Sequence, residues 1–312
     1  MSLQLFNGEA LEVMDKLITE GVTVDSIITD VPYQMTACGW DFSLPFNNHL
    51  MLPKSSKSKK LVPIYKDEYL LQELKKGRGY KEISEYFDST SKEGMWQKLN
   101  KLIKPDGAVL LFGSEPFSSA LRMSNVKNYK YDWIWEKPTA TGHLNAKKQP
   151  MRAYETISVF YKKQPFYYPI KTKGHTRKVS SAVSRAKSIK RAVGKTKVYG
   201  DGIATKVTDY DSTERYPRNV IRFATDRQKS KIHPTQKPVA LMEYLVKTYT
   251  RESELVLDFT MGSFTTALAC LNTKRNFIGI ELDDNYFKVG LERLEKHLGT
   301  LDYKPKVVYY LK

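Results

Sequence analysis

The segment 254–282, ELVLDFTMGSFTTALACLNTKRNFIGIEL, contains the pattern that decides the fold of this chain. An apolar strand ends at Asp258, small residues form a turn at Gly262 and Ser263, and a helix begins at Thr265. A second apolar strand follows and ends at Glu281. A strand, a helix and a further strand in this order predict a unit with two parallel strands.

The same alternation of strands and helices continues from this segment to both ends of the chain. Hydrophobic periodicity predicts strands at residues 3–6, 25–31, 108–113, 129–136, 156–162, 255–259 and 276–282, and helices at 9–18, 94–103, 116–123, 238–249, 265–271 and 285–298. This alternation is typical of a mostly parallel sheet with helices on both faces. We therefore expect a Rossmann-like α/β fold.

The charge of the chain indicates a polyanionic partner. Lysines and arginines number 51 against 34 aspartates and glutamates, a formal net charge of +17, so nucleic acid is the first candidate. A membrane surface is the alternative, but no apolar run approaches a spanning helix and the N-terminus does not resemble a signal peptide. We expect a cytoplasmic protein. Cys38 and Cys270 lack the spacing of a zinc site, so no metal is expected.

Two segments interrupt the α/β pattern. Residues 48–93 begin with a charged run and are interpreted as an insertion. Residues 164–214 are interpreted as a basic lobe. The remaining segments, residues 1–47, 94–163 and 215–312, are expected to form one α/β domain. Residues 156–200 contain twelve lysines and arginines and no acid, flanked by aromatics, which favours DNA contact over a solvated loop. The expected DNA contacts are Lys171, Lys173, Arg177, Lys178, Arg185, Lys187, Lys190 and Arg191.

The turn after Asp258 suits a ligand that carries a carboxylate, because backbone amides and the positive end of a helix approach it. Glu281 stands where an acid binds the hydroxyls of ribose. The loop lacks both the glycine pattern of dinucleotide sites and the Gly-Lys-Ser/Thr of a P-loop. S-adenosylmethionine, which has no phosphate, is the remaining common ligand, and a plain strand-turn-helix without a ligand is the alternative.

A second strand ends in polar and aromatic residues, within SIITDVPYQM at residues 26–35. Its apolar run stops at Asp30, Val31, Pro32 and Tyr33. Ligands of open α/β sheets bind outside the carboxyl ends of the strands, so this cluster suits a planar substrate. Ordinary loop punctuation by aspartate and proline is the alternative interpretation.

These motifs resemble those of amino-group DNA methyltransferases of the permuted, beta-type order, in which the catalytic motif precedes the cofactor motif. Phage and prophage adenine methylases are the most similar. Residues 30–33, DVPY, match the family tetrapeptide D/N/S-P-P-Y/F/W, and residues 258–266, DFTMGSFTT, match its D-P-F-x-G-S-G-T-T loop. HPTQKP at residues 233–238 is intact. Val31 replaces a proline but keeps the backbone carbonyl that the family uses, whereas Phe264 puts a side chain where glycine is usual.

The resemblance implies methyl transfer from S-adenosylmethionine to N6 of adenine in DNA, with the base flipped out of the duplex. Asp30 and the Val31 carbonyl would accept hydrogen bonds from the amine, Tyr33 would stack on the base, and Pro32 would stiffen the turn. A cytosine-N4 enzyme and a catalytically decayed DNA-binding protein of the same fold are the alternatives.

The resemblance also implies the cofactor contacts, with Glu281 on the ribose, Glu9 at the adenine amino group and Lys237 near the carboxylate. The expected set is Glu9, Ala10, Asp258, Phe259, Thr260, Gly262, Ser263, Thr265, Glu281, Leu282 and Lys237. Double-stranded DNA is the expected partner. A homodimer and a cognate restriction endonuclease are left open.

Overall fold

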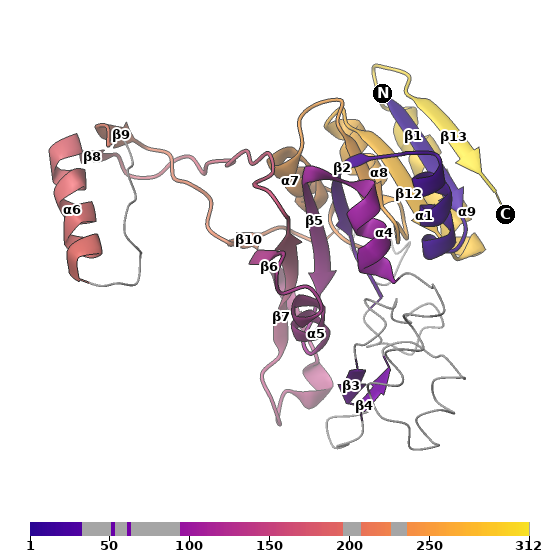
Figure 1. Cartoon of the computed structure of the whole chain (residues 1–312), viewed down its shortest axis with the longest axis horizontal. Coiled ribbons are helices and arrows are strands. Elements are labelled where there is room, and N and C mark those ends of the chain that lie inside the picture. The colour runs from indigo at the N-terminus through magenta and orange to yellow at the C-terminus, as the bar shows by residue number, and fades with distance from the viewer. Residues whose placement is uncertain (33–50, 54–60, 64–93, 196–206, 226–235, 312) are drawn as a thin grey trace. The chain divides into compact units, whose positions relative to one another are not determined.

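The computed structural model describes residues 1–32, 51–53, 61–63, 94–195, 207–225 and 236–311, with the backbone alone at 51–53, 61–63 and 189–195. The chain forms two compact units (Figure 1). The larger unit consists of Met1–Tyr168 and Asn219–Lys312, and the smaller unit is Pro169–Arg218. Most of the predicted insertion lies outside the described residues, apart from β3 (Met51–Pro53) and β4 (Leu61–Pro63), which pair in antiparallel fashion.

The larger unit is built on a sheet of nine described strands in the order β10-β6-β7-β5-β2-β11-β12-β1-β13. Their bounds are β1 (Ser2–Asn7), β2 (Val24–Thr29), β5 (Ile103–Gly113), β6 (Tyr129–Thr141), β7 (Arg152–Phe160), β10 (Val220–Arg222), β11 (Leu255–Asp258), β12 (Asn276–Glu281) and β13 (Lys306–Tyr310). β7 is antiparallel to both of its neighbours, and the remaining pairs are parallel. The predicted mostly parallel α/β sheet is confirmed.

Helices cover both faces of this sheet. On one face lie α1 (Ala10–Thr19), α4 (Met95–Leu102) and α5 (Phe117–Met123), and on the other lie α7 (Val239–Tyr249), α8 (Thr265–Asn272) and α9 (Asp284–Leu298). Strand β5, inside the sheet, shows the reason, because successive side chains of a strand point to opposite faces. Val109 and Leu111 join the core under α1 and α4, whereas Leu110 and Phe112 join the core under α7 and α8.

Several strand boundaries differ from the sequence prediction. β6 and β7 extend to Thr141 and Arg152, beyond the predicted segments, and β10 and β13 were not predicted. β13 pairs with β1, where Tyr310 stacks on Phe6 with the ring centroids 4.2 Å apart. Such short edge strands are defined by their neighbours more than by their own periodicity.

The smaller unit contains β8 (Lys178–Ser180), which pairs antiparallel with β9 (Tyr210–Ser212), and the helix α6 (Ala182–Lys195). No helix was predicted in this basic segment.

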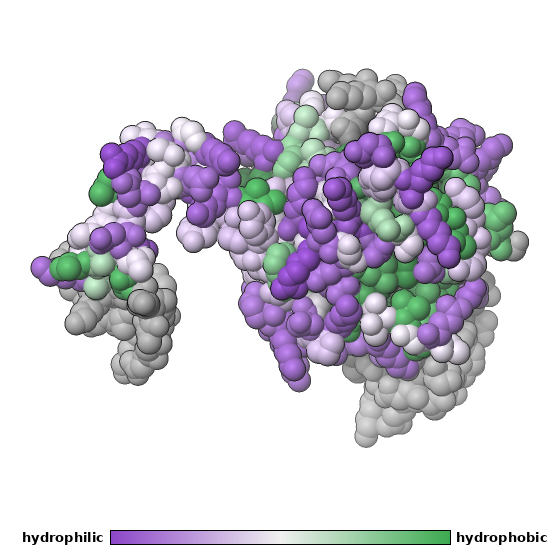
Figure 2. Space-filling view, turned by 90° about the horizontal axis from the view of Figure 1, so that it is seen from above, coloured by the Kyte–Doolittle hydropathy of each residue, from purple (hydrophilic) through white to green (hydrophobic). Residues whose placement is uncertain are grey.

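The molecular surface seen in Figure 2 is mostly hydrophilic, with hydrophobic residues in separate patches. Within the described residues, every helix is too short or too polar to cross a membrane.

Candidate active site

The carboxyl ends of three neighbouring parallel strands meet at one edge of the sheet. β2, β11 and β12 are adjacent in that order. Asp30 follows β2, Asp258 ends β11, and Glu281 ends β12. The fold therefore brings the predicted catalytic carboxylate and two predicted cofactor-binding carboxylates to the edge where ligands of α/β sheets bind.

The Asp258 carboxylate fixes the loop that follows it. Asp258 is 3% exposed. Its Oδ1 accepts hydrogen bonds from the Thr29 hydroxyl at 2.6 Å and from the Thr260 amide at 3.2 Å. Its Oδ2 accepts a hydrogen bond from the Thr266 hydroxyl at 2.5 Å. Burial raises the pKa of Asp258 to about 6, although these hydrogen bonds oppose the shift. The Thr260 hydroxyl also donates to the Asp30 carbonyl at 3.1 Å, which links this loop to the end of β2.

The Glu281 carboxylate joins the other side of the same loop. Its Oε1 accepts from the Asp283 amide at 2.9 Å and its Oε2 from the Gly262 amide at 2.8 Å. Burial raises the pKa of Glu281, and the two backbone hydrogen bonds oppose the shift. Gly262 has a φ of 51°, a conformation that glycine adopts without strain. Each carboxylate oxygen has a second lone pair, so Glu281 is able to accept further hydrogen bonds from a ligand.

Phe264 occupies the position where the resembling loop has its second glycine. Its backbone is left-handed, with φ 62° and ψ 26°, and its side chain is fully buried. The ring packs edge-on against Phe287, with the centroids 5.5 Å apart. Gly290 of α9 makes room for the ring, since a Cβ there would lie 2.4 Å from Cδ1 of Phe264. The loop thus keeps a backbone typical of glycine while the phenylalanine side chain lies in the core.

Arg293 of α9 contacts the loop, although no local sequence pattern predicts this contact. Its Nη1 donates to the Ser263 carbonyl at 2.7 Å and to the Thr265 hydroxyl at 2.9 Å. Arginine in an amphipathic helix is usually a solvated residue, so only the three-dimensional structure assigns it to the loop. Arg293 holds the turn against α9.

The Asp30 carboxylate belongs to a cluster of two acids and two lysines. Nζ of Lys237 lies 2.5 Å from Oδ2 of Asp30 and 3.1 Å from Oε2 of Glu155. Lys137 lies 2.9 Å from Oε1 of Glu155. The Lys237 side chain is 8% exposed, and its ammonium also lies over the Phe112 ring, 5.3 Å from the centroid.

The pKa values in this cluster follow from its ion pairs. Burial raises the pKa of Glu155, but the ammonium groups of Lys237 and Lys137 outweigh that effect and hold it at about 2. Burial lowers the pKa of Lys237, and its two carboxylate partners reverse this and raise it. Glu155 and Lys237 are therefore both ionised at neutral pH. Sequence patterns pointed to neither Glu155 nor Lys137, because both lie within strands.

Gln236 carries a buried side-chain amide that makes no hydrogen bond with the described residues. The residue is 5% exposed, and neither its side-chain nitrogen nor its oxygen has a partner in that part of the chain. An unsatisfied buried amide is costly, so such a group indicates a ligand or ordered water. Gln236 precedes Lys237 and therefore lies next to the charged cluster.

The remaining predicted cofactor residues have different surroundings. Glu9 caps α1, where its carboxylate accepts from the Glu12 amide at 2.8 Å, and Ala10 is buried. Phe259 is 1% exposed and packs in the core, whereas Leu282 is 36% exposed. The predicted base-stacking residue Tyr33 lies outside the described residues. Groups of three or more His, Cys, Asp or Glu able to hold a metal ion are absent from the described part of the chain.

The predicted DNA contacts divide into two groups. Arg177 pairs with Asp211, Arg185 donates to the Thr208 carbonyl, and Lys171 lies 3.5 Å from Glu214. Lys173, Lys178 and Lys187 are exposed. The side chains of Lys190 and Arg191 in α6 lie outside the described set. The first group stabilises the fold of the smaller unit, and the second group is available to a partner.

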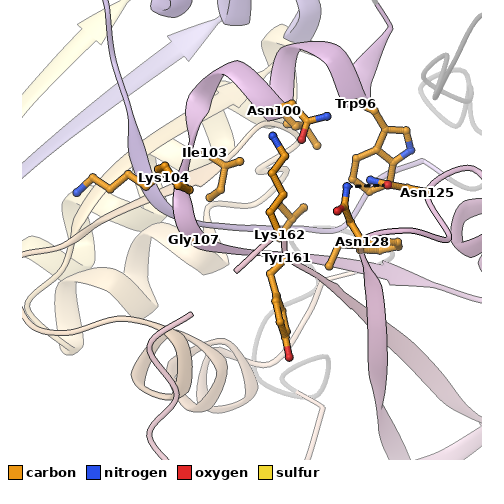
Figure 3. Close-up of a pocket in the computed structure, with 13 residues that line it drawn as sticks. Trp96, Asn100, Ile103, Lys104, Gly107, Asn125, Asn128, Tyr161 and Lys162 are labelled. Carbon is orange, nitrogen blue, oxygen red and sulfur yellow. Dashed lines mark hydrogen bonds between the residues drawn. The ribbon is translucent and has the colours of Figure 1, made fainter. Parts of the chain in front are cut away.

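A separate pocket lies at the opposite edge of the sheet (Figure 3). It is lined by residues of α4, the start of β5 and the end of β7 with the residues after it, including Trp96, Asn100, Lys104 and Lys162. Strand β5 begins at this edge and runs toward the edge that carries Asp30. The pocket is therefore not part of the candidate active site.

Sequence relatives of the chain are named as methyltransferases. The type II methyltransferase M.HindIII of Haemophilus influenzae is 23% identical over 93% of this chain and 94% of its own length. The DNA adenine methyltransferase YhdJ of Escherichia coli is 40% identical over 80 residues, and this match spans 26% of each protein.

Solved structures of similar fold include the M1.HpyAVI complex with S-adenosylmethionine, which has a TM-score of 0.54 and 21% sequence identity. The match covers 94% of this chain and 98% of the M1.HpyAVI chain. The cytosine-N4-specific PvuII DNA methyltransferase has a TM-score of 0.50, 16% identity and coverage of 96% and 91%. The beta-type order and the similarity to phage enzymes stay predictions. The family profile of N6 and N4 DNA methylases matches residues 24–292. The match covers most of the chain, which therefore belongs to this DNA methylase family.

Proposed function

We propose that the chain transfers a methyl group from S-adenosylmethionine to the exocyclic N6 amine of adenine in double-stranded DNA. The observation that carries this proposal is the position of Asp30, anchored by Lys237 at the carboxyl edge of the sheet, one loop away from the Glu281 and Gly262 contact. The DVPY tetrapeptide and the similarity to an enzyme named as a DNA adenine methyltransferase support adenine.

The adenine amine needs activation because its lone pair is delocalised into the ring. Asp30 and the Val31 carbonyl would accept its two N–H groups and draw the nitrogen toward tetrahedral geometry. Lys237 holds Oδ2 of Asp30, which fixes the orientation of the carboxylate. As a carboxylate, Asp30 is a strong hydrogen-bond acceptor.

The residues at the loop fit an adenosine with an amino-acid tail. S-adenosylmethionine supplies an electrophilic methyl sulfonium when it is bound. Glu281 would accept hydrogen bonds from the ribose hydroxyls, and the turn at Gly262 and Ser263 would approach the amino-acid part. The unbonded buried amide of Gln236 fits a polar ligand at this edge. Lys237 already pairs with two acids, so we assign it to Asp30 and not to the carboxylate of the cofactor.

Mass analysis of nucleosides tests the proposal directly. Unmethylated duplex DNA is incubated with the protein and S-adenosylmethionine, digested, and examined for N6-methyladenine and N4-methylcytosine. We expect N6-methyladenine with the wild type and none with Asp30→Ala, whose calorimetric affinity for the cofactor should be retained. N4-methylcytosine would reassign the substrate base, and DNA binding without any methylated nucleoside would indicate a decayed enzyme.

A further inference from the structure

The hairpin between β6 and β7 extends beyond the rest of the described sheet. Strands β6 and β7 pair as far as Thr141 and Arg152 (Figure 1). All residues from 141 to 152 are exposed. The tip contains the single helical turn η1 (His143–Asn145), entered through Gly142 with a φ of 90°. Packing among the described residues of the larger unit does not account for a hairpin of this length.

The hairpin tip carries an apolar side chain in full contact with solvent. Leu144 is 87% exposed, more than any other large apolar residue among those the structure describes. Met151 and Tyr154, near the start of β7, are 41% and 45% exposed. Exposed apolar residues that gather on one element indicate a contact surface, whereas isolated ones are common.

The charge around this apolar tip favours a polyanion. From Lys137 to Tyr154 the sequence contains no aspartate or glutamate. Lys147 and Lys148 flank the tip, and neither makes an ion pair or side-chain hydrogen bond with the described residues. Arg152 donates to the Ser114 hydroxyl at 2.7 Å, which ties the first residue of β7 to the residue that follows β5.

The hairpin begins at the candidate active site. β6 is parallel to β5 and β2, because β7 is antiparallel to both β5 and β6. The hairpin therefore leaves the sheet at the edge that carries Asp30. Its two strands contribute Lys137 and Glu155, and Glu155 is joined through Lys237 to Asp30. Any DNA that presents a base to Asp30 consequently passes close to this hairpin.

We propose that the β6–β7 hairpin enters the DNA beside the target base, with Leu144 inserted between base pairs and Lys147 and Lys148 on the flanking phosphates. Apolar wedges of this kind unstack a base step, and extrusion of the target base has a free-energy cost that such a wedge offsets. This role rests on the proposed methyl transfer to DNA.

The first experiment compares methyl transfer to a long unmethylated duplex with transfer to the same DNA denatured into single strands. Leu144→Ser should lower the rate on the duplex about tenfold or more and change the rate on single strands less than about twofold, because single-stranded DNA needs no base extrusion. The control is Leu311→Ser, since Leu311 is a 72% exposed leucine next to β13, at the other end of the sheet. Equal rate losses on both substrates, or no loss, would overturn the wedge.

A second readout does not depend on methyl transfer. Insertion of a side chain between base pairs unwinds DNA. A closed plasmid that a topoisomerase relaxes in the presence of the wild type should therefore show a changed linking number. Leu144→Ser should abolish this change. Unwinding without methylated product would support the hairpin and defeat the proposed function. Methyl transfer without unwinding by the wild type would keep the function and defeat the hairpin.

Discussion

Nζ of Lys237 lies 2.5 Å from Oδ2 of Asp30, within a site where the lysine side chain is only 8% exposed. The contact joins the start of α7 to the end of β2 and fixes the orientation of the carboxylate. A buried charge that loses its partner is strongly destabilised or changes its protonation state. Lys237 is thus a positioning residue for Asp30.

The first prediction concerns the loss of this ammonium. Lys237→Met should lower kcat about a hundredfold, because small displacements of a positioned group cost that much, while cofactor affinity stays the same. The acidic limb of the pH profile of kcat should move to higher pH, since Asp30 loses the ammonium that lies 2.5 Å from its Oδ2. Lys137→Met, which leaves the Lys237 and Asp30 contact in place, is the matched control. Weaker cofactor binding with unchanged kcat would place Lys237 at the cofactor instead.

The second prediction concerns the pH dependence of folding. The folded-state pKa of Glu155, about 2, is below the ordinary value of 4.5, so its stabilising effect is complete above pH 4.5 and is lost as the pH falls toward 2. Glu155→Gln should lower the free energy of unfolding at pH 7, and the difference from the wild type should shrink below pH 4.5. Urea unfolding at a series of pH values measures this difference. Glu136→Gln, which breaks the exposed pair with Arg222, should show a small difference throughout.

The third prediction concerns cofactor affinity. Glu281→Ala should weaken binding of S-adenosylmethionine by about 1.5 to 3 kcal/mol, the contribution of hydrogen bonds to a charged group, or about ten- to hundredfold in Kd. The substitution also frees the Gly262 amide, which loosens the loop. Calorimetric titration measures the change, and Glu292→Ala on the exposed face of α9 is the control. An unchanged Kd would remove Glu281 from the cofactor site.

The strands and the main acids of the site could be predicted from the sequence because both depend on local patterns. Trp133 and Trp135 alternate along β6 and are 3% and 2% exposed, as period-two alternation predicts for a strand. Asp30 and Glu281 end apolar runs, and parallel strands necessarily bring such ends to one edge.

The partners of these acids could not be predicted, because they come from distant parts of the chain. Lys237 follows Asp30 by 207 residues, and Glu155 is one of many polar residues in a strand. No local pattern distinguishes a lysine that binds a cofactor from one that holds a catalytic acid. The same reasoning applies to Phe264, whose buried ring depends on the space above Gly290 in a later helix.

The fourth prediction tests that steric relationship. Phe264→Gly should destabilise the protein by about 2 to 3 kcal/mol, because the loss of a buried ring exceeds the relief of its left-handed backbone. Gly290→Ala should destabilise it by about 1 to 3 kcal/mol through contact with the ring. The double variant should be more stable than the sum of the two effects predicts, since the alanine then occupies the space of the ring. Chemical denaturation of all four proteins measures the coupling, and strict additivity would contradict it.

The fifth prediction concerns the smaller unit and the salt dependence of DNA binding. Lys173, Lys178 and Lys187 are exposed, whereas Arg177 is engaged by Asp211. If the three lysines contact phosphates, their joint replacement by glutamine should reduce the slope of log affinity against log salt by about 2.7, at about 0.9 per contact. Phosphate contacts do not read sequence, so binding to specific and random duplexes should weaken alike, and cofactor affinity should not change. Arg177→Gln is the control, because an arginine that is already paired releases few counterions. A triple variant with the slope of the wild type would show that these lysines face solvent and that the phosphate contacts come from other parts of the chain.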